Sequence, residues 1–244
     1  MPPMQKIIEL LDENDFFLWE YYGRGFLGKF QTYIFRSRIK VLMKLLKCLN
    51  LIPKTILDVG CGPMFISYSL TRTFSSEYIG IDLIHSNRLK KYRDAMRNIG
   101  VKNIEVIRAS AEYLPFKDES FDILLSLDVI EHLRQPRTAI IEISRVNKNI
   151  FGISLPLENL FQRLARIGFK LMKIMGDPMP KKSNQINITK IPNYHYVGDI
   201  KTYDDMIIEL KEQFIPFIVN YTPIGLFKSI NVNAVHLFKK KKLT

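Results

Sequence analysis

Cysteine is scarce in this chain of 244 residues: Cys48 and Cys61 are the only two. Two cysteines exclude a disulfide framework and are too few for a cysteine-based zinc site, so we expect a reducing compartment. Histidine is also scarce, with four residues, and the histidines and the scattered acids show no metal-ligand spacing. We therefore expect no metal site.

Long apolar runs are absent as well. Although 47% of the residues are hydrophobic, Lys or Arg interrupts every apolar stretch before it reaches the roughly 18 residues that a membrane span needs. The start of the chain, Met1-Pro2-Pro3-Met4, is soon followed by acids and does not have the pattern of a signal peptide. The hydrophobic content supports a sizeable core, which excludes global disorder. We expect a cytoplasmic globular protein, with contact to a membrane surface left open.

Acidic residues are outnumbered, because 36 Lys and Arg face 24 Asp and Glu, which gives a formal net charge of +12. The excess is regional. Seven basic residues and no acid lie between Gly23 and Cys48, and seven basic residues with one acid lie between Asn159 and Lys190. The remaining chain is nearly neutral, so the charge marks two segments rather than the whole surface.

From Thr55 onward, short apolar runs alternate with helical patterns, which is typical of a parallel α/β sheet. The sequence therefore predicts a doubly wound, Rossmann-like α/β fold with a seven-stranded, mostly parallel sheet. We expect an N-terminal helical extension over residues 1–50 and a main domain over 51–244, with an insertion or lid near 156–200. The expected strands are 55–60, 78–83, 104–109, 121–127, 149–155, 215–221 and 233–239, and the expected helices are 35–49, 64–74, 87–99, 137–146, 160–175 and 203–213.

One turn indicates a binding site. The stretch ILDVGCGPM, from Ile56 to Met64, places an acid and two glycines where a strand turns into a helix. Glycines allow a tight turn and close approach to a ligand, and the following helix offers free N–H groups. Asp82 ends the next strand, 20 residues beyond Gly62, where a carboxylate accepts hydrogen bonds from ribose hydroxyls. The pattern predicts a nucleoside-cofactor site; a plain tight connection is the alternative.

This pattern resembles the class I S-adenosylmethionine-dependent methyltransferases, in the branch that includes quinone, sterol and other small-molecule methyltransferases. The resemblance covers roughly residues 56–156 and rests on four ordered blocks: ILDVGCGPM, YIGIDL (78–83), ASAEYLPF (109–116) and SFDILLSLDVIEHL (120–133). An NAD enzyme would need a third glycine, whereas Pro63 and Met64 follow Gly62 here. The resemblance implies an enzyme whose cofactor is S-adenosyl-L-methionine.

The resemblance also assigns residues to parts of the cofactor. Asp58 and the turn 60–62 would hold the amino acid portion, and the strand end 82–83 would bind the ribose hydroxyls and the adenine face. The pair 110–111 would contact the adenine amino group, and the pair 126–127 would face the methionine moiety and the methyl group. The assigned residues are Asp58, Gly60, Cys61, Gly62, Asp82, Leu83, Ser110, Ala111, Ser126 and Leu127.

Two positions depart from the family. The family usually has glycine where Met64 stands, and we expect Met64 to leave less room beside the cofactor's tail. The family commonly has aspartate where Ser110 stands, and Ser110 can still accept a hydrogen bond from the adenine amine.

A general base is needed only if the acceptor must lose a proton before it is methylated; otherwise positioning the acceptor is sufficient. The candidate bases are Asp128, just after the fourth strand, His132 in Glu131-His132-Leu133, and His195 in the expected insertion. A structural or helix-capping role is the alternative for His132, and an ordinary loop role is the alternative for His195.

The basic segments have an amphipathic pattern. In residues 35–49, a helical wheel separates an apolar face from a face with Arg36, Lys40, Lys44 and Lys47, with Arg38 at the boundary, and residues 160–175 combine a wide apolar face with a basic stripe. Packing on the sheet explains such helices. The alternatives are contact with an anionic membrane surface or a cover over an apolar acceptor. Nucleic acid binding also stays open, although no RNA-binding module is present.

We therefore expect methyl transfer to a small-molecule acceptor that is hydrophobic or lipid-like. One alternative is an RNA or protein methyltransferase that docks through the basic segments. Another is a non-catalytic partner protein that binds S-adenosylmethionine. The acceptor, the methylated atom and the oligomeric state stay open at this point.

Overall fold

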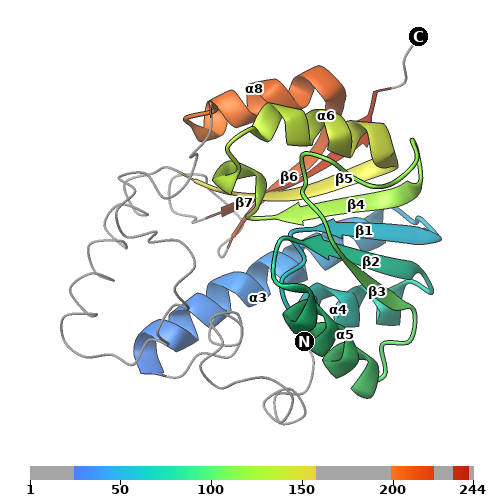
Figure 1. Ribbon diagram of the computed structural model, residues 1–244. Coiled ribbons are helices and arrows are strands. Elements are labelled where there is room, and N and C mark those ends of the chain that lie inside the picture. Colours follow the sequence, from blue (N-terminus) through green and yellow to red (C-terminus); the bar gives the residue numbers. More distant parts are fainter. Residues whose placement is uncertain (1–24, 158–198, 223–232, 242–244) are drawn as a thin grey trace.

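A seven-stranded sheet with helices on both faces forms the body of the protein (Figure 1). The computed structural model describes residues 25–157, 199–222 and 233–241. The strand order is β3-β2-β1-β4-β5-β7-β6, so the predicted doubly wound, seven-stranded fold is confirmed. The helix expected over 160–175 and most of the expected insertion lie outside the described residues.

The strands coincide with the apolar runs of the sequence to within about two residues. β1 pairs in parallel with β2 and β4, and β2–β3 and β4–β5 are also parallel, whereas β7 is antiparallel to β5 and β6. The mostly parallel arrangement is therefore confirmed. The strands are β1 (Thr55–Val59), β2 (Glu77–Asp82), β3 (Ile104–Arg108), β4 (Phe121–Leu127), β5 (Asn147–Pro156), β6 (Phe214–Thr222) and β7 (Asn233–Lys240).

The helices divide between the two faces of the sheet (Figure 1). One hydrophobic cluster joins the sheet to α3 (Gly25–Cys48), α4 (Phe65–Thr73) and α5 (Ser86–Asn98). A second cluster joins it to α6 (Pro136–Val146) and α8 (Tyr203–Gln213). Local signals set where these helices begin: Pro136 is in the first turn of α6, and the Thr202 hydroxyl accepts a hydrogen bond from the Asp205 N–H at the start of α8.

Helix α3 is longer than the sequence predicted, because it begins at Gly25 rather than near residue 35. Its predicted apolar face is buried at Ile39, Leu42 and Leu46, and it contacts β6, β7 and α4. Arg38 is also buried, although the helical wheel placed it at the boundary. No helix among the described residues is long and apolar enough to cross a membrane. The division at residue 50 stays a prediction.

The strand order defines where a ligand would bind. From β1 the chain moves outward to β2 and β3 and then returns to β4 on the other side of β1. Open α/β sheets bind ligands at such a reversal, beside the carboxyl ends of the strands. The register places Val59 opposite both Ile81 and Ser126. The segments that follow β1, β2 and β4 therefore meet at one edge, and these are the segments that carry the predicted site.

Candidate cofactor and acceptor site

The turn after β1 has a left-handed backbone at three positions: φ is 74° at Gly60, 47° at Gly62 and 56° at Met64. At Gly60 the requirement is twofold, because a Cβ atom there would also overlap the side chain of Val129. The glycine turn therefore packs directly against the segment that follows β4. This contact brings the predicted cofactor turn next to the segment that carries the candidate base Asp128.

Met64 occupies a backbone conformation that favours glycine, which gives a physical reason for the glycine usual in the family. Its side chain is fully buried, and Sδ lies 3.3 Å from where a Cβ on Gly80 would be. The sequence led us to expect that Met64 takes room beside the cofactor's tail. Instead, its side chain packs in the core beneath the turn.

Asp82 connects the end of β2 to the glycine turn. Its Oδ2 accepts a hydrogen bond from the Gly62 N–H at 2.9 Å, and its Oδ1 accepts one from the Ile84 N–H at 3.1 Å. Burial raises the pKa of Asp82, while these N–H donors oppose that rise. The Gly60 and Cys61 N–H groups both donate to the Ile81 carbonyl. The turn is thus held in place by its own donors rather than left as a row of free N–H groups.

Asp58 lies beneath the turn, with its side chain almost completely buried. It accepts a hydrogen bond from the Tyr78 hydroxyl on the neighbouring strand. Burial raises the pKa of Asp58 to about 7, the Tyr78 hydrogen bond lowers it, and the nearby Asp82 carboxylate raises it. The Cys61 side chain is also buried, against Gly80, so only its backbone faces the predicted site.

The adenine side of the predicted site is formed by the end of β2 and the loop after β3. Leu83 is 58% exposed, which leaves an apolar face available at the sheet edge. Ser110 uses its hydroxyl within the loop, where it accepts a hydrogen bond from the Glu112 N–H at 3.2 Å. Ala111 is buried in the cluster beneath α6. The adenine site between Leu83 and the loop stays a prediction.

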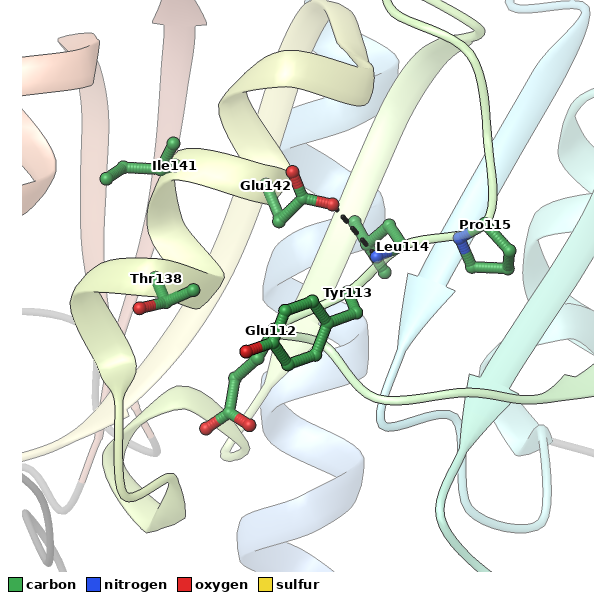
Figure 2. Close-up of a pocket in the computed structure, with 7 residues that line it drawn as sticks. All are labelled: Glu112, Tyr113, Leu114, Pro115, Thr138, Ile141 and Glu142. Carbon is green, nitrogen blue, oxygen red and sulfur yellow. Dashed lines mark hydrogen bonds between the residues drawn. The ribbon is translucent and has the colours of Figure 1, made fainter.

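Helix α6 holds this loop from outside. The Leu114 N–H donates to Glu142 Oε2 at 2.9 Å, as Figure 2 shows, and Arg145 donates to the carbonyls of Leu114 and Phe116 at 3.0 and 2.8 Å. A shallow pocket of about 470 Å³ lies between the loop and α6. None of the predicted cofactor residues lines it; its lining residues are Glu112, Tyr113, Leu114, Pro115, Thr138, Ile141 and Glu142.

The acceptor side begins where β4 ends. Ser126 is fully buried, and its hydroxyl has no hydrogen-bond partner among the described residues. Asp128 has a φ of 55°, and its carboxylate accepts hydrogen bonds from Ser154 Oγ at 2.6 Å and Asn233 Nδ2 at 3.1 Å. It also forms an ion pair with Arg38 from α3. Asp128 could act as a base only by giving up these donors.

Two further side chains follow in the short 3₁₀ helix η1 (Ile130–His132). The Glu131 side chain is completely buried, and neither carboxyl oxygen has a hydrogen-bond partner among the described residues. Burial raises the pKa of Glu131 to about 8, although the positive charge of Arg38 lowers it. His132 is 30% exposed, and its Nε2 lies 3.9 Å from Glu131 Oε1. The third candidate base, His195, lies outside the described residues.

The structure brings together Asp128 and His132, but it adds partners that the sequence analysis did not assign. These are Arg38, Glu131, Ser154 and Asn233. Of these, only Glu131 had a sequence signal, because it precedes His132 in the fourth block. Within the described ranges, no group of three or more His, Cys, Asp or Glu could hold a metal ion.

The residues at the sheet edge fit S-adenosylmethionine. The turn at Gly60 has no room for a side chain, an acid is fixed beside it at Asp82, and the buried Asp58 lies below. A close backbone approach combined with two carboxylates suits a ligand that carries ribose hydroxyls and an ammonium group.

Comparison with known proteins supports this view. Residues 57–149 match the family described as "Methyltransferase domain". An uncharacterised protein of Methanocaldococcus jannaschii is 32% identical over 136 residues, which covers 56% of this chain and 55% of that protein. The mitochondrial ubiquinone biosynthesis O-methyltransferase of Dictyostelium discoideum is 32% identical over 101 residues, covering 38% of this chain and 32% of that protein.

Two further proteins extend the comparison. The phthiotriol/phenolphthiotriol dimycocerosates methyltransferase of Mycobacterium tuberculosis is 31% identical over 113 residues, covering 46% of this chain and 40% of that protein. The structure of magnesium protoporphyrin IX methyltransferase from Synechocystis, with bound S-adenosylhomocysteine, matches with a TM-score of 0.63 at 15% identity, covering 98% of this chain and 100% of that one. The chain thus spans about half or less of the length of these curated relatives. Residues 57–149 thus match a methyltransferase domain, and the fold and the glycine turn agree with the class I, S-adenosylmethionine-dependent type.

Proposed function

We propose that the protein transfers the methyl group of S-adenosylmethionine to a small, hydrophobic or lipid-like acceptor. The observation that carries this proposal is the glycine turn fixed to Asp82 at the reversal of the strand order. In this proposal the cofactor residues keep the roles that the sequence assigned to them. Asp58 and the turn hold the amino acid portion, Asp82 binds the ribose hydroxyls, and Leu83 with Ser110–Ala111 binds the adenine.

When bound, the cofactor supplies an electrophilic methyl group on a sulfonium with a good leaving group. The chain's own task is to place the acceptor atom in line and to exclude water. Leu127 and the fully buried Ser126 lie at the end of β4, where they would face the methionine moiety and the methyl group. If the acceptor must lose a proton, His132 is the better placed candidate among the described residues, because Asp128 is already paired.

The acceptor class rests on two supports. Relatives that match this domain are named for acting in ubiquinone biosynthesis and on phthiotriol dimycocerosates, both of which name large apolar compounds. In addition, α3 presents an exposed basic face beside the sheet, with Arg36, Lys40, Lys44 and Lys47, and this helix contains no acid. We propose that this face contacts an anionic membrane surface from which an apolar acceptor is taken.

The same basic face is also the feature that supports the second candidate function, methylation of RNA or protein. Phosphate-rich partners bind exposed lysines in a salt-dependent way, just as anionic lipids do. Labelled methyl donor incubated with cell extract and the protein separates these candidates. Label in the lipid fraction supports the first proposal, label in RNA or protein supports the second, and label in none supports a non-catalytic binding protein.

Calorimetry with S-adenosylhomocysteine tests the cofactor site directly. We expect Asp82→Ala to weaken binding by about tenfold or more, because it removes both the ribose acceptor and the hydrogen bond from the Gly62 N–H. Glu77→Ala is the matched control, since Glu77 is exposed at the opposite end of the same strand. Equal affinities of wild type and Asp82→Ala would show that the assignment of Asp82 is wrong.

A further inference from the structure

Arg38 is the buried cation of α3, and it pairs with a carboxylate. Its side chain is 5% exposed and forms an ion pair with Asp128, whose side chain is 20% exposed. The two residues come from distant parts of the chain: α3 precedes the first strand, whereas Asp128 follows β4. A charged pair that is this well buried joins the N-terminal helix to the acceptor side of the site.

Asp128 has an unusual backbone. Its φ of 55° lies in the left-handed region, which costs free energy for a residue other than glycine. Such a conformation persists only where the surroundings hold it, and here donors from three elements do so. Ser154 on β5, Asn233 on β7 and Arg38 on α3 all bind the Asp128 carboxylate, and the Asp128 N–H donates to the Ser154 carbonyl at 3.1 Å.

The segment that begins at Asp128 borders both halves of the site. The next residue, Val129, occupies the space that a side chain at Gly60 would need. After Val129, η1 carries Glu131, and the positive charge of Arg38 lowers the pKa of its buried carboxyl group. The guanidinium of Arg38 therefore acts on two acids, the partly buried Asp128 and the fully buried Glu131, and removing it would leave Asp128 without its countercharge.

We propose that Arg38 is a positioning residue: by pairing with Asp128, it holds the segment 128–132 in the conformation that completes the acceptor side. The N-terminal helix is then part of the active site rather than an appended element. This inference rests on the proposed methyl transfer. Because Asp82 and Ser110 lie at the ends of β2 and β3, on the other side of β1, the pair should matter more for transfer than for cofactor binding.

The test compares full-length Arg38→Met with Lys91→Met, which removes an exposed cation from α5, away from the basic face of α3. At a temperature well below unfolding, we expect Arg38→Met to bind S-adenosylhomocysteine with an affinity within about threefold of wild type. We expect it to transfer methyl label about tenfold or more slowly than wild type to the extract fraction that wild type labels. We also expect faster amide hydrogen exchange over residues 126–132, with little change over 60–64. Lys91→Met should match wild type in all three measurements.

Arg38→Lys keeps the positive charge, and it is the variant to measure if Arg38→Met does not fold. We expect it to restore transfer in part, because an ammonium group can pair with Asp128 but lacks the planar guanidinium geometry. Transfer and exchange like those of wild type in Arg38→Met would overturn the proposal. So would a loss of cofactor binding in parallel with transfer, which indicates a purely structural role. Absence of cofactor binding and of label transfer in wild type would instead refute the proposed function, and exchange over 126–132 would still decide whether Arg38 holds the segment.

Discussion

At the scale of single residues, Gly60 connects the two halves of the site. It needs a left-handed φ and also leaves the space that the Val129 side chain fills. Gly100 makes a matched comparison, because its φ is also positive, at 97°, but an added Cβ would meet nothing within 4 Å. Substituting each glycine in turn therefore separates the free-energy cost of backbone strain from the cost of filling space that another side chain occupies.

We expect Gly100→Ala to cost about 1–2 kcal/mol, the price of a left-handed conformation for alanine. Gly60→Ala should cost about 1–3 kcal/mol more, because Val129 must also move. Gly60→Ala should in addition weaken the binding of S-adenosylhomocysteine, whereas Gly100→Ala should not. Urea unfolding and calorimetry on both variants measure the two effects. Equal losses of stability in the two variants would contradict the packing argument.

Asp58 predicts a pH dependence of stability. Burial raises the pKa of Asp58 from 3.8 to about 7, so the folded protein binds this proton more tightly than the unfolded chain does. The stabilising contribution is fully present below the unfolded pKa, and it is lost as the pH rises through about 7. Glu131, whose pKa rises from 4.5 to about 8, acts in the same direction. The free energy of unfolding should therefore fall between pH 5 and 8.

Asp58 should account for a fall of about 3 kcal/mol in the free energy of unfolding between pH 5 and pH 7, because one pKa unit corresponds to about 1.4 kcal/mol. Asp58→Asn should remove this part of the fall. Asp94→Asn on the exposed side of α5 should leave the slope as in wild type. Urea unfolding curves at intervals between pH 5 and 8 measure it. A slope in Asp58→Asn as steep as in wild type would show that Asp58 does not titrate in this range.

At the scale of elements, the adenine loop depends on α6 for its position. Arg145 donates to the Leu114 and Phe116 carbonyls, and it also pairs with Glu142 and Asp118 at 2.8 Å. These hydrogen bonds raise the pKa of Arg145 and lower that of Glu142, so both groups stay charged at neutral pH. The loop that carries Ser110 and Ala111 is thus supported by side chains from a helix 30 residues later.

We therefore expect Arg145→Met to weaken S-adenosylhomocysteine binding by about three- to tenfold and to destabilise the protein by about 1–3 kcal/mol, because two loop carbonyls lose their donor. Arg137→Met is the control on the same helix. Arg137 is 55% exposed and pairs with Asp199 and Glu209 rather than with the loop. Its loss should leave cofactor affinity unchanged. Unchanged affinity in Arg145→Met would show that the loop is held without α6.

At the scale of the whole molecule, charge is distributed unevenly over the surface. The outer face of α3 carries Lys40, Lys44 and Lys47, all exposed, on a helix without acids. On the inner face of the same helix, Arg38 forms an ion pair with Asp128. The basic surface and the residue that pairs with Asp128 therefore belong to one helix, which gives the proposed membrane contact a physical basis.

This predicts binding to vesicles that contain anionic lipid. A variant with glutamine at Lys40, Lys44 and Lys47 should bind phosphatidylcholine–phosphatidylglycerol vesicles about tenfold or more weakly, since each lysine near an anionic surface contributes about 1 kcal/mol. The charge-matched control replaces the exposed Lys90, Lys91 and Lys102 and should bind like wild type. High salt should abolish binding. Equal loss in both variants, or retention of tRNA but not vesicles, would contradict membrane docking by α3.

The fold and the position of the glycine turn beside Asp82 could be predicted from the sequence. Apolar runs predict the strands, and apolar residues at helical spacing predict the helices. The acid and the two glycines at the end of β1 lie within about ten residues of each other, so a local pattern reports them. Thr202 marked the start of α8 for the same reason, since capping involves only neighbouring residues. The placement of Asp82 beside Gly62 followed from parallel strand pairing, which the sequence pattern already implies.

The surroundings of Asp128 and Glu131 depend on tertiary contacts that no local pattern predicts. Arg38, on the boundary of a helical wheel, became a buried partner of Asp128 because α3 packs where β4 and β5 end and β7 begins. The Met64 side chain packs in the core beneath the turn, where Gly80 has no side chain that would crowd it. Glu131 became buried through the position of η1. Such contacts join residues that are far apart in the chain, so no local pattern reports them; the overall charge of +12 marked the helix concerned but not its one buried cation.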